Sequence, residues 1–76
     1  MNRIKQYRNT IGVNQKTIGD LVGVDQSSIN RYETGERKPS IEMGWKIVKV
    51  FNCLGCNCSF NDVFPDPKTN HTESTQ

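Results

Sequence analysis

The chain has 76 residues, a third of them hydrophobic, and a formal net charge of +2 at pH 7. This length suffices for one small domain and leaves no room for a second. No stretch approaches the roughly 20 apolar residues of a membrane-spanning helix, and residues 1–20 lack the apolar segment of a secretory signal. We therefore expect a cytoplasmic protein with no membrane association.

The charge is unevenly distributed along the chain. Residues 1–49 hold nine of the ten Lys and Arg residues with five acids, whereas residues 50–76 hold one base with three acids. A basic first part indicates a face that could bind an anion such as nucleic acid. On charge alone, an ordinary solvated surface explains the pattern equally well.

Apolar residues three and four positions apart predict two helices in the first part of the chain. The first runs over residues 2–10, and the second over residues 15–22 after the N-cap Asn14. Gly12 and Gly23 follow them, where a left-handed residue commonly ends a helix. The side chains expected to face the core are Ile4, Tyr7, Arg8 and Ile11, followed by Ile18, Leu21 and Val22.

Two further helices are predicted beyond residue 25. Asp25 is the N-cap of a helix over residues 26–34, which buries Ile29 and Tyr32. A polar turn follows, and Ser40 then begins a longer helix. The side chains of that helix expected to face the core are Ile41, Trp45, Val48 and Phe51.

The last part of the chain is less regular. Residues 52–58 interrupt the apolar periodicity and predict a loop, after which Ser59 begins a short helix that Pro65 ends. Phe60, Val63 and Phe64 are expected to point inward. Residues 66–76 contain no apolar residue, so we expect a folded domain over residues 1–64 and a disordered tail over residues 65–76.

The connection between the second and third helices carries the functional signal. These helices, within residues 15–34, are joined by only Gly23, Val24 and Asp25. A tight connection with a glycine is typical of a helix-turn-helix, whose second helix enters the major groove of DNA. The pattern therefore predicts an all-α, five-helix domain with a helix-turn-helix.

The segment QKTIGDLVGVDQSSINRYETGERKPS, residues 15–40, resembles the signature of the Cro and phage-repressor (Xre) family. The shared features are Gln at the start of the second helix, Gly-Val at the turn, Ile within the third helix, then Glu-x-Gly and Pro-Ser. The resemblance covers about 60 residues. It implies a compact domain like that of lambda repressor, and a sequence-specific DNA-binding transcriptional regulator.

Four polar residues of the third helix are candidates for reading bases. With Ile29 inward, Gln26, Ser27, Asn30 and Arg31 can face outward. Gln can pair with adenine in the major groove, Arg with guanine, and Ser with several bases. The resemblance implies base contacts for Gln26, Ser27 and Arg31. The alternative is that all four form a solvated helix face.

A second group of residues is expected to contact phosphates. The resemblance implies this role for Gln15, which would also brace the first base-reading residue. It also implies backbone contacts from the loop that holds Arg37 and Lys38, for which a plain exposed loop is the alternative. Such contacts supply affinity and salt dependence, not sequence preference. Weaker phosphate candidates are Asn14, Lys16 and Thr34.

Two glycines depart from the family pattern. Gly19 stands where the family has a small Ala, which permits close helix packing but weakens the second helix by about 1 kcal/mol. Gly44 stands where a Leu is usual and leaves a gap that we expect Trp45 to fill. Both departures concern stability more than function.

A cysteine-containing insertion over residues 53–58 is a third departure. It brings Cys53, Cys56 and Cys58 into one loop, and three hypotheses remain open for it. A structural zinc site needs four ligands, the fourth being His71 or Asp62. A thiol–disulfide switch and partly buried reduced thiols are the other two, and the last is favoured. We therefore assign no metal and no cofactor.

No constellation in the sequence supports catalysis, so we expect no enzyme activity. The expected partner is a double-stranded DNA operator, bound by a homodimer that reads two half-sites. Phe60, Val63 and Phe64, together with the inserted loop over residues 53–58, are candidates for the dimer surface, with core closure as the alternative for two of the three. The rival function is docking on a protein partner, such as a larger repressor or a toxin, because a net charge of +2 is modest for a DNA-binding protein.

Overall fold

The computed structural model describes residues 2–65, which form five helices and, within that range, no strand. The helices are α1 (Ile4–Ile11), α2 (Gln15–Val22), α3 (Gln26–Thr34), α4 (Ile41–Cys53) and α5 (Phe60–Val63). The all-α prediction is confirmed. In this range no helix is long and apolar enough to cross a membrane. The tail expected to be disordered lies, from residue 66 on, outside the described residues.

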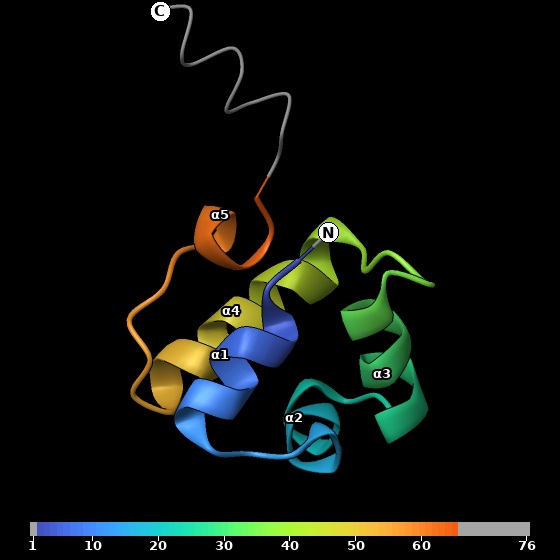
Figure 1. The fold of residues 1–76 in the computed structure, drawn as a ribbon, viewed down its shortest axis with the longest axis horizontal. Helices are drawn as coiled ribbons and strands as arrows, with labels where there is room; N and C mark the ends of the chain where they lie inside the picture. Colours follow the sequence, from blue (N-terminus) through green and yellow to red (C-terminus); the bar gives the residue numbers. More distant parts are fainter. Residues whose placement is uncertain (1, 66–76) are drawn as a thin grey trace, which may run out of the picture.

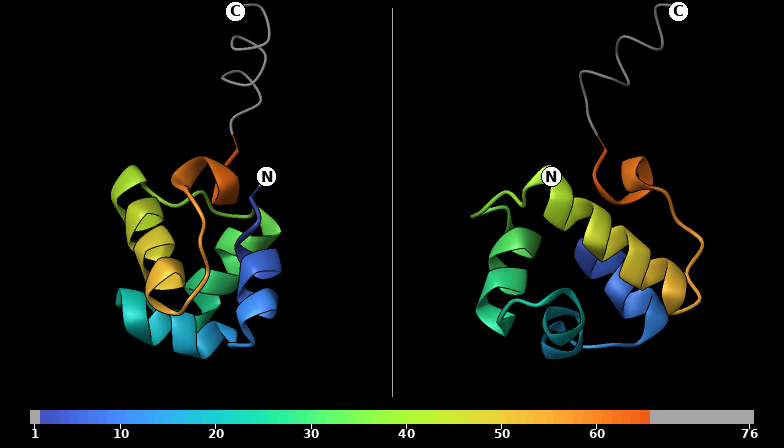
Figure 2. Two further views of the ribbon diagram at one scale, coloured as in Figure 1. Left: turned by 90° about the vertical axis from the view of Figure 1, so that its left-hand side faces the viewer. Right: turned by 180° about the vertical axis from the view of Figure 1, so that it is seen from behind.

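The helices surround one core. α1 and α4 run side by side, α2 and α3 cover one end of this pair, and α5 packs near the start of the chain (Figures 1 and 2). The backbone N–H of Arg3 donates to the carbonyl of Val63 over 2.7 Å, which joins the two ends of the domain. The largest fully buried side chains are Ile4, Ile18, Ile29, Ile47, Phe51 and Val63.

Side-chain caps begin three of the helices at the predicted residues. Asn14, Asp25 and Ser40 each accept a hydrogen bond from the backbone N–H three residues further on, over 2.8–3.0 Å. Hydrogen bonds from the Ser28 hydroxyl and N–H hold the pKa of Asp25 below its usual value. Because each of these caps lies directly before its helix, α2 and α3 start at defined positions.

The start of α1 differs from the prediction. Asn2 was expected inside the helix, but α1 begins at Ile4. The side-chain oxygen of Asn2 accepts from the N–H of Ile4 over 3.1 Å, and its amide nitrogen donates to the carbonyl of Tyr32 over 2.7 Å. An Asn side chain that bonds to nearby backbone competes with helix formation. Asn2 therefore ties the chain to α3 instead of extending α1.

Three of the predicted core residues are exposed. Leu21 is 53% exposed, Ile41 70% and Trp45 56%. The buried side of α4 instead runs through Gly44, Ile47, Val48 and Phe51. The neighbouring helices cover only part of the wide apolar side of each helix, and the rest of that side stays exposed. The core prediction was therefore wrong at these three positions.

Phe60 fills the gap beside Gly44, so the expectation that Trp45 would fill it was wrong. A Cβ added to Gly44 would lie 2.7 Å from Cε2 of Phe60 and 3.4 Å from the Phe64 ring. Trp45 covers the outer side of Phe60, with ring centroids 4.8 Å apart, and Phe60 lies 5.1 Å from Phe64. The missing side chain on α4 thus makes room for an aromatic ring from α5.

Gly19 has no room for a side chain. It is buried, and an added Cβ would lie 2.7 Å from the carbonyl oxygen of Val24 and 3.3 Å from backbone atoms of Asp25. Contacts below 3.0 Å with backbone require the α2–α3 connection itself to move. The sequence predicted that Gly19 permits close helix packing at the cost of a weaker helix, and the structure shows that the close approach is between α2 and the turn that follows it.

Replacing Gly19 with alanine is therefore expected to lower the free energy of unfolding by about 1–3 kcal/mol, as overpacking does. The gain in helix propensity, about 1 kcal/mol, offsets only part of the clash. Thr17→Ala, at an exposed position of the same helix, is the matched control. Urea unfolding followed by circular dichroism measures both variants. A more stable Gly19→Ala variant would contradict the close approach.

Candidate nucleic-acid interface

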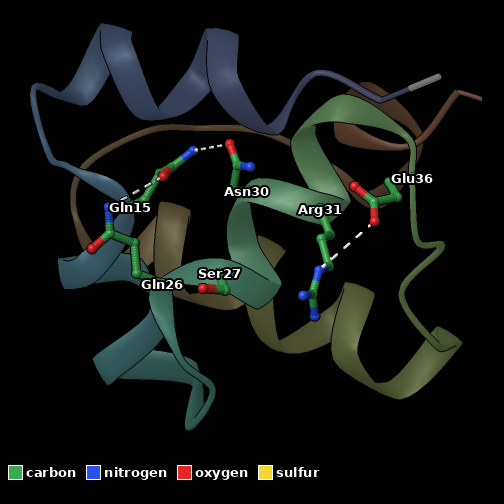
Figure 3. Close-up of a pocket in the computed structure, with 6 residues that line it drawn as sticks. All are labelled: Gln15, Gln26, Ser27, Asn30, Arg31 and Glu36. Atoms are coloured by element: carbon green, nitrogen blue, oxygen red, sulfur yellow. Dashed lines mark hydrogen bonds and ion pairs between the residues drawn. The ribbon is translucent and has the colours of Figure 1, made fainter.

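Two inward side chains fix the orientation of α3. Ile29 is fully buried and Tyr32 nearly so, which places one side of α3 against the core. The opposite side must then face outward because a helix repeats every 3.6 residues. As a result, the polar residues of α3 lie on the surface next to the start of α2 (Figure 3).

These residues line a shallow polar hollow of about 350 Å³. Its lining comprises Gln15, Gln26, Ser27, Asn30, Arg31 and Glu36 (Figure 3). The four predicted base-reading residues therefore come together on one face, and Gln15 of α2 joins them. Amides, a hydroxyl and a guanidinium give this face both hydrogen-bond donors and acceptors.

A chain of hydrogen bonds connects the amides in the hollow. Nε2 of Gln15 donates to Oδ1 of Asn30 over 3.1 Å and to Oε1 of Glu33 over 3.0 Å. Nε2 of Gln26 donates to Oε1 of Gln15 over 3.5 Å. The contact between Gln15 and Gln26 agrees with the bracing role that the resemblance implied. Gln15 thus links the residues of the hollow to the interior of the domain.

Arg8 and Glu33 form the interior part of this network, which sequence reasoning missed. Nε and Nη2 of Arg8 donate to the two carboxylate oxygens of Glu33 over 2.7 and 3.2 Å, and Nη1 donates to the carbonyl of Val13. The side chain of Glu33 is only 3% exposed. The available signal was the position of Arg8 on the apolar side of the first helix, since a charge there requires a buried partner.

Glu36 was also missed as a residue of the hollow. Its carboxylate lies 3.9 Å from Nε of Arg31, and both side chains are largely exposed. An exposed pair at this distance contributes little to stability. Arg31 can therefore leave Glu36 at small cost to bind another acceptor.

Apart from Gln15, the predicted phosphate-contacting residues do not line the hollow. Asn14 is occupied as the cap of α2, and Lys16 pairs with Asp20 over 3.1 Å on the outer face of that helix. The Thr34 hydroxyl donates to the carbonyl of Arg31 over 3.2 Å. Arg37 and Lys38 are exposed in the loop after α3, where both cationic side chains can reach solvent.

The cysteines lie at the far end of the domain. α4 continues to Cys53, so the predicted loop begins two residues later than expected. Cys58 is buried, and Nδ2 of Asn52 donates to its carbonyl over 2.8 Å. Burial, with a smaller contribution from the Cys56 thiol, raises the pKa of Cys58 to about 11. The Cys58 thiol is therefore protonated at neutral pH.

The zinc hypothesis gains no support from the arrangement of these cysteines. Within residues 2–65, no three Cys, His, Asp or Glu side chains gather closely enough to hold a metal ion. The Asp62 carboxylate instead accepts from the N–H of Ser59 over 2.9 Å and completes the capping box of α5. His71 lies outside the described residues.

Comparison with known proteins agrees with this architecture. A family model described as helix-turn-helix matches residues 4–54. The chain belongs to this helix-turn-helix family, of the Xre type. The matched residues contain α1 to α4 with the hollow, and end at the start of the cysteine loop.

Two curated relatives are similar over about two thirds of the chain. An uncharacterized HTH-type transcriptional regulator of Archaeoglobus fulgidus is 36% identical over 50 residues, which cover 66% of this chain and 71% of the relative. The HTH-type regulator YgzD of Bacillus subtilis, also uncharacterized, is 33% identical over 51 residues, covering 67% of this chain and 77% of the relative.

Proposed function

We propose that this helix-turn-helix protein binds duplex DNA in a sequence-specific manner by inserting α3 into the major groove. The observation that carries this proposal is the hollow, in which Gln26, Ser27, Asn30 and Arg31 share one exposed face. Side chains of these types match the hydrogen-bonding edges of base pairs in the major groove. In this role the side chain of Gln15 braces Gln26, while the backbone N–H groups at the start of α2 contact a phosphate.

We further propose that binding regulates transcription, because both curated relatives are named HTH-type transcriptional regulators. A regulator that binds chromosomal or phage DNA would act in the cytoplasm. A repressor-like role follows if its operator overlaps a promoter, since the bound domain then blocks access to it.

Dimerisation on a symmetric operator is part of the same proposal. Trp45 is exposed against the half-buried ring of Phe60, which contacts that of Phe64, and the exposed Ile41 lies one helical turn before Trp45 on α4. α4 and α5 thus offer an apolar surface to a second copy. Val63 is fully buried and belongs to the core, so it drops out of the dimer candidates named from the sequence. A two-fold dimer would read half-sites about one helical turn apart.

In vitro selection of duplexes bound by the purified full chain tests the proposal. We expect an enriched motif with adenine and guanine at defined positions, repeated as an inverted pair about 10 base pairs apart. Enrichment of a single unpaired motif would support binding by a monomer. Recovery of random sequence at physiological salt would contradict sequence-specific binding, and would favour docking on a protein partner.

Arg37 and Lys38 are expected to contribute to affinity without reading bases. The double variant Arg37→Ala/Lys38→Ala should weaken binding of every duplex alike and reduce the slope of log K against log salt by about 2, one for each lost phosphate contact. Fluorescence anisotropy at several salt concentrations measures this slope. Lys46→Ala/Lys49→Ala removes the same charge from a separate groove between α2 and α4 and serves as the control. Equal slopes for the two double variants would exclude the contacts.

A further inference from the structure

Glu33 determines the direction of every hydrogen bond in the amide network. Arg8 holds both oxygens of this buried carboxylate in a two-point ion pair. An ionised carboxylate can only accept hydrogen bonds. The end of the Gln15 amide that meets Glu33 must therefore be its nitrogen, which donates over 3.0 Å.

The orientation of the Gln15 amide in turn sets the orientation of the amides of Asn30 and Gln26 in the hollow. The second hydrogen on Nε2 of Gln15 is donated to Asn30, so the oxygen of Asn30 turns toward Gln15 and its Nδ2 is left for the hollow. The oxygen of Gln15 faces Gln26 and accepts from its Nε2. Gln26 then retains one N–H and its own oxygen for a ligand. One buried charge thus orients three amides, of which those of Gln26 and Asn30 are exposed.

We propose that Glu33, which touches no base, is a positioning residue that determines the DNA sequence preference of Gln26 and Asn30. This inference rests on the proposed function. With Nδ2 outward, Asn30 selects bases that present acceptors in the major groove, which are guanine, thymine and the N7 edge of adenine, and rejects cytosine. The free N–H and oxygen of Gln26 match N7 and N6 of adenine.

Glu33→Gln tests the direction of the network. The oxygen of the new amide keeps the shortest bond, 2.7 Å from Nε of Arg8, and its nitrogen then stands where Oε1 accepted from Nη2 of Arg8 and from Nε2 of Gln15, which forces the Gln15 amide to rotate. Asn30 then directs its oxygen outward and Gln26 shares its oxygen with Gln15. We expect the preference at the Asn30 position to move toward cytosine by about tenfold, and the adenine preference at the Gln26 position to fall by about as much.

Competition among duplexes that differ at these two base pairs gives the affinity ratios. Val48→Ala, a core change on α4 away from the network, controls for lost stability. If Glu33 had only a structural role, Glu33→Gln would lower the affinity for all duplexes alike and leave the affinity ratios unchanged. This is the result that we expect for Val48→Ala. Unchanged ratios in folded Glu33→Gln protein would overturn the proposal.

Gln15→Met provides a second variant in case Glu33→Gln does not fold. Methionine removes the link between the interior and the hollow but retains Arg8 with Glu33. Both exposed amides can then rotate freely, so discrimination should relax at both positions, and intact discrimination would overturn the proposal. Wild-type protein that binds no duplex would remove the DNA-binding proposal itself, an outcome distinct from wild-type binding with unaltered ratios in the variants.

Discussion

Replacing Arg8 with methionine is expected to lower the free energy of unfolding by about 3–5 kcal/mol, the usual cost of breaking a buried ion pair. The variant leaves the carboxylate of Glu33, 3% exposed, without the guanidinium that holds both of its oxygens. Methionine retains the aliphatic volume of the side chain, so the loss reports the charge more than the packing. The whole free energy of unfolding of a single domain is only about 5–15 kcal/mol, so this loss is a large part of it.

Urea unfolding at neutral pH measures this loss, and the double variant Arg8→Met/Glu33→Gln is its matched control. Removing both charges leaves no unpaired buried ion, so we expect the double variant to be more stable than Arg8→Met alone. An Arg8→Met protein that unfolds at the wild-type urea concentration would show that solvent reaches Glu33. A double variant less stable than Arg8→Met would contradict the charge explanation.

Replacing Arg31 with alanine is expected to weaken binding of the selected duplex by about 1–3 kcal/mol, or roughly 5- to 150-fold. Arg31 is the only cation among the six residues that line the hollow, where its Nε lies 3.9 Å from the carboxylate of Glu36. A guanidinium donates two parallel hydrogen bonds to O6 and N7 of guanine, which alanine cannot replace. The loss should therefore be confined to duplexes with guanine at that position.

Anisotropy titrations with the selected duplex and with a duplex changed at the guanine measure this effect. Lys49→Ala removes one positive charge from α4, outside the hollow, and should bind both duplexes as the wild type does. Gln26→Ala should produce a loss of similar size at an adenine position. If Arg31→Ala weakens both duplexes equally, Arg31 contacts the backbone and does not read a base.

These two predictions separate the framework of the interface from its contact surface. Arg8→Met is expected to lower the stability of the domain, an effect that does not depend on the DNA sequence. Arg31→Ala is expected to lower the affinity only for duplexes with guanine at one position. Glu33 belongs to both, because it pairs with Arg8 and directs Gln15. The hollow is therefore organised by a residue that does not line it.

Interactions between residues close in sequence made the helices and the outward polar side of α3 predictable from the sequence. Caps at Asn14, Asp25 and Ser40 set where three helices begin, and each cap lies where its residue type predicts. Ile29 and Tyr32, three positions apart, fixed the inner side of α3 and thereby its outer side. Such signals act over fewer than five residues, so they can be read without knowing the tertiary contacts.

Predictions that depended on distant partners were less successful. Leu21 and Trp45 continued apolar stripes that the neighbouring helices do not cover. The space beside Gly44 is occupied by Phe60, sixteen residues further along, and not by the adjacent Trp45. Periodicity identifies a wide apolar face, but the crossing of another helix decides which part of that face is buried.

The sequence by itself determined a basic, all-helical domain with a helix-turn-helix and named the polar residues of α3 that now line one hollow. Only the tertiary structure decided how those residues are held. It brings Arg8 of α1 to Glu33 of α3 and sets Gln15 of α2 between that pair and Asn30. The position of Arg8 on the apolar side of its helix indicates that a partner is needed, but not that the partner is Glu33, because residues 25 positions apart meet only in the folded chain.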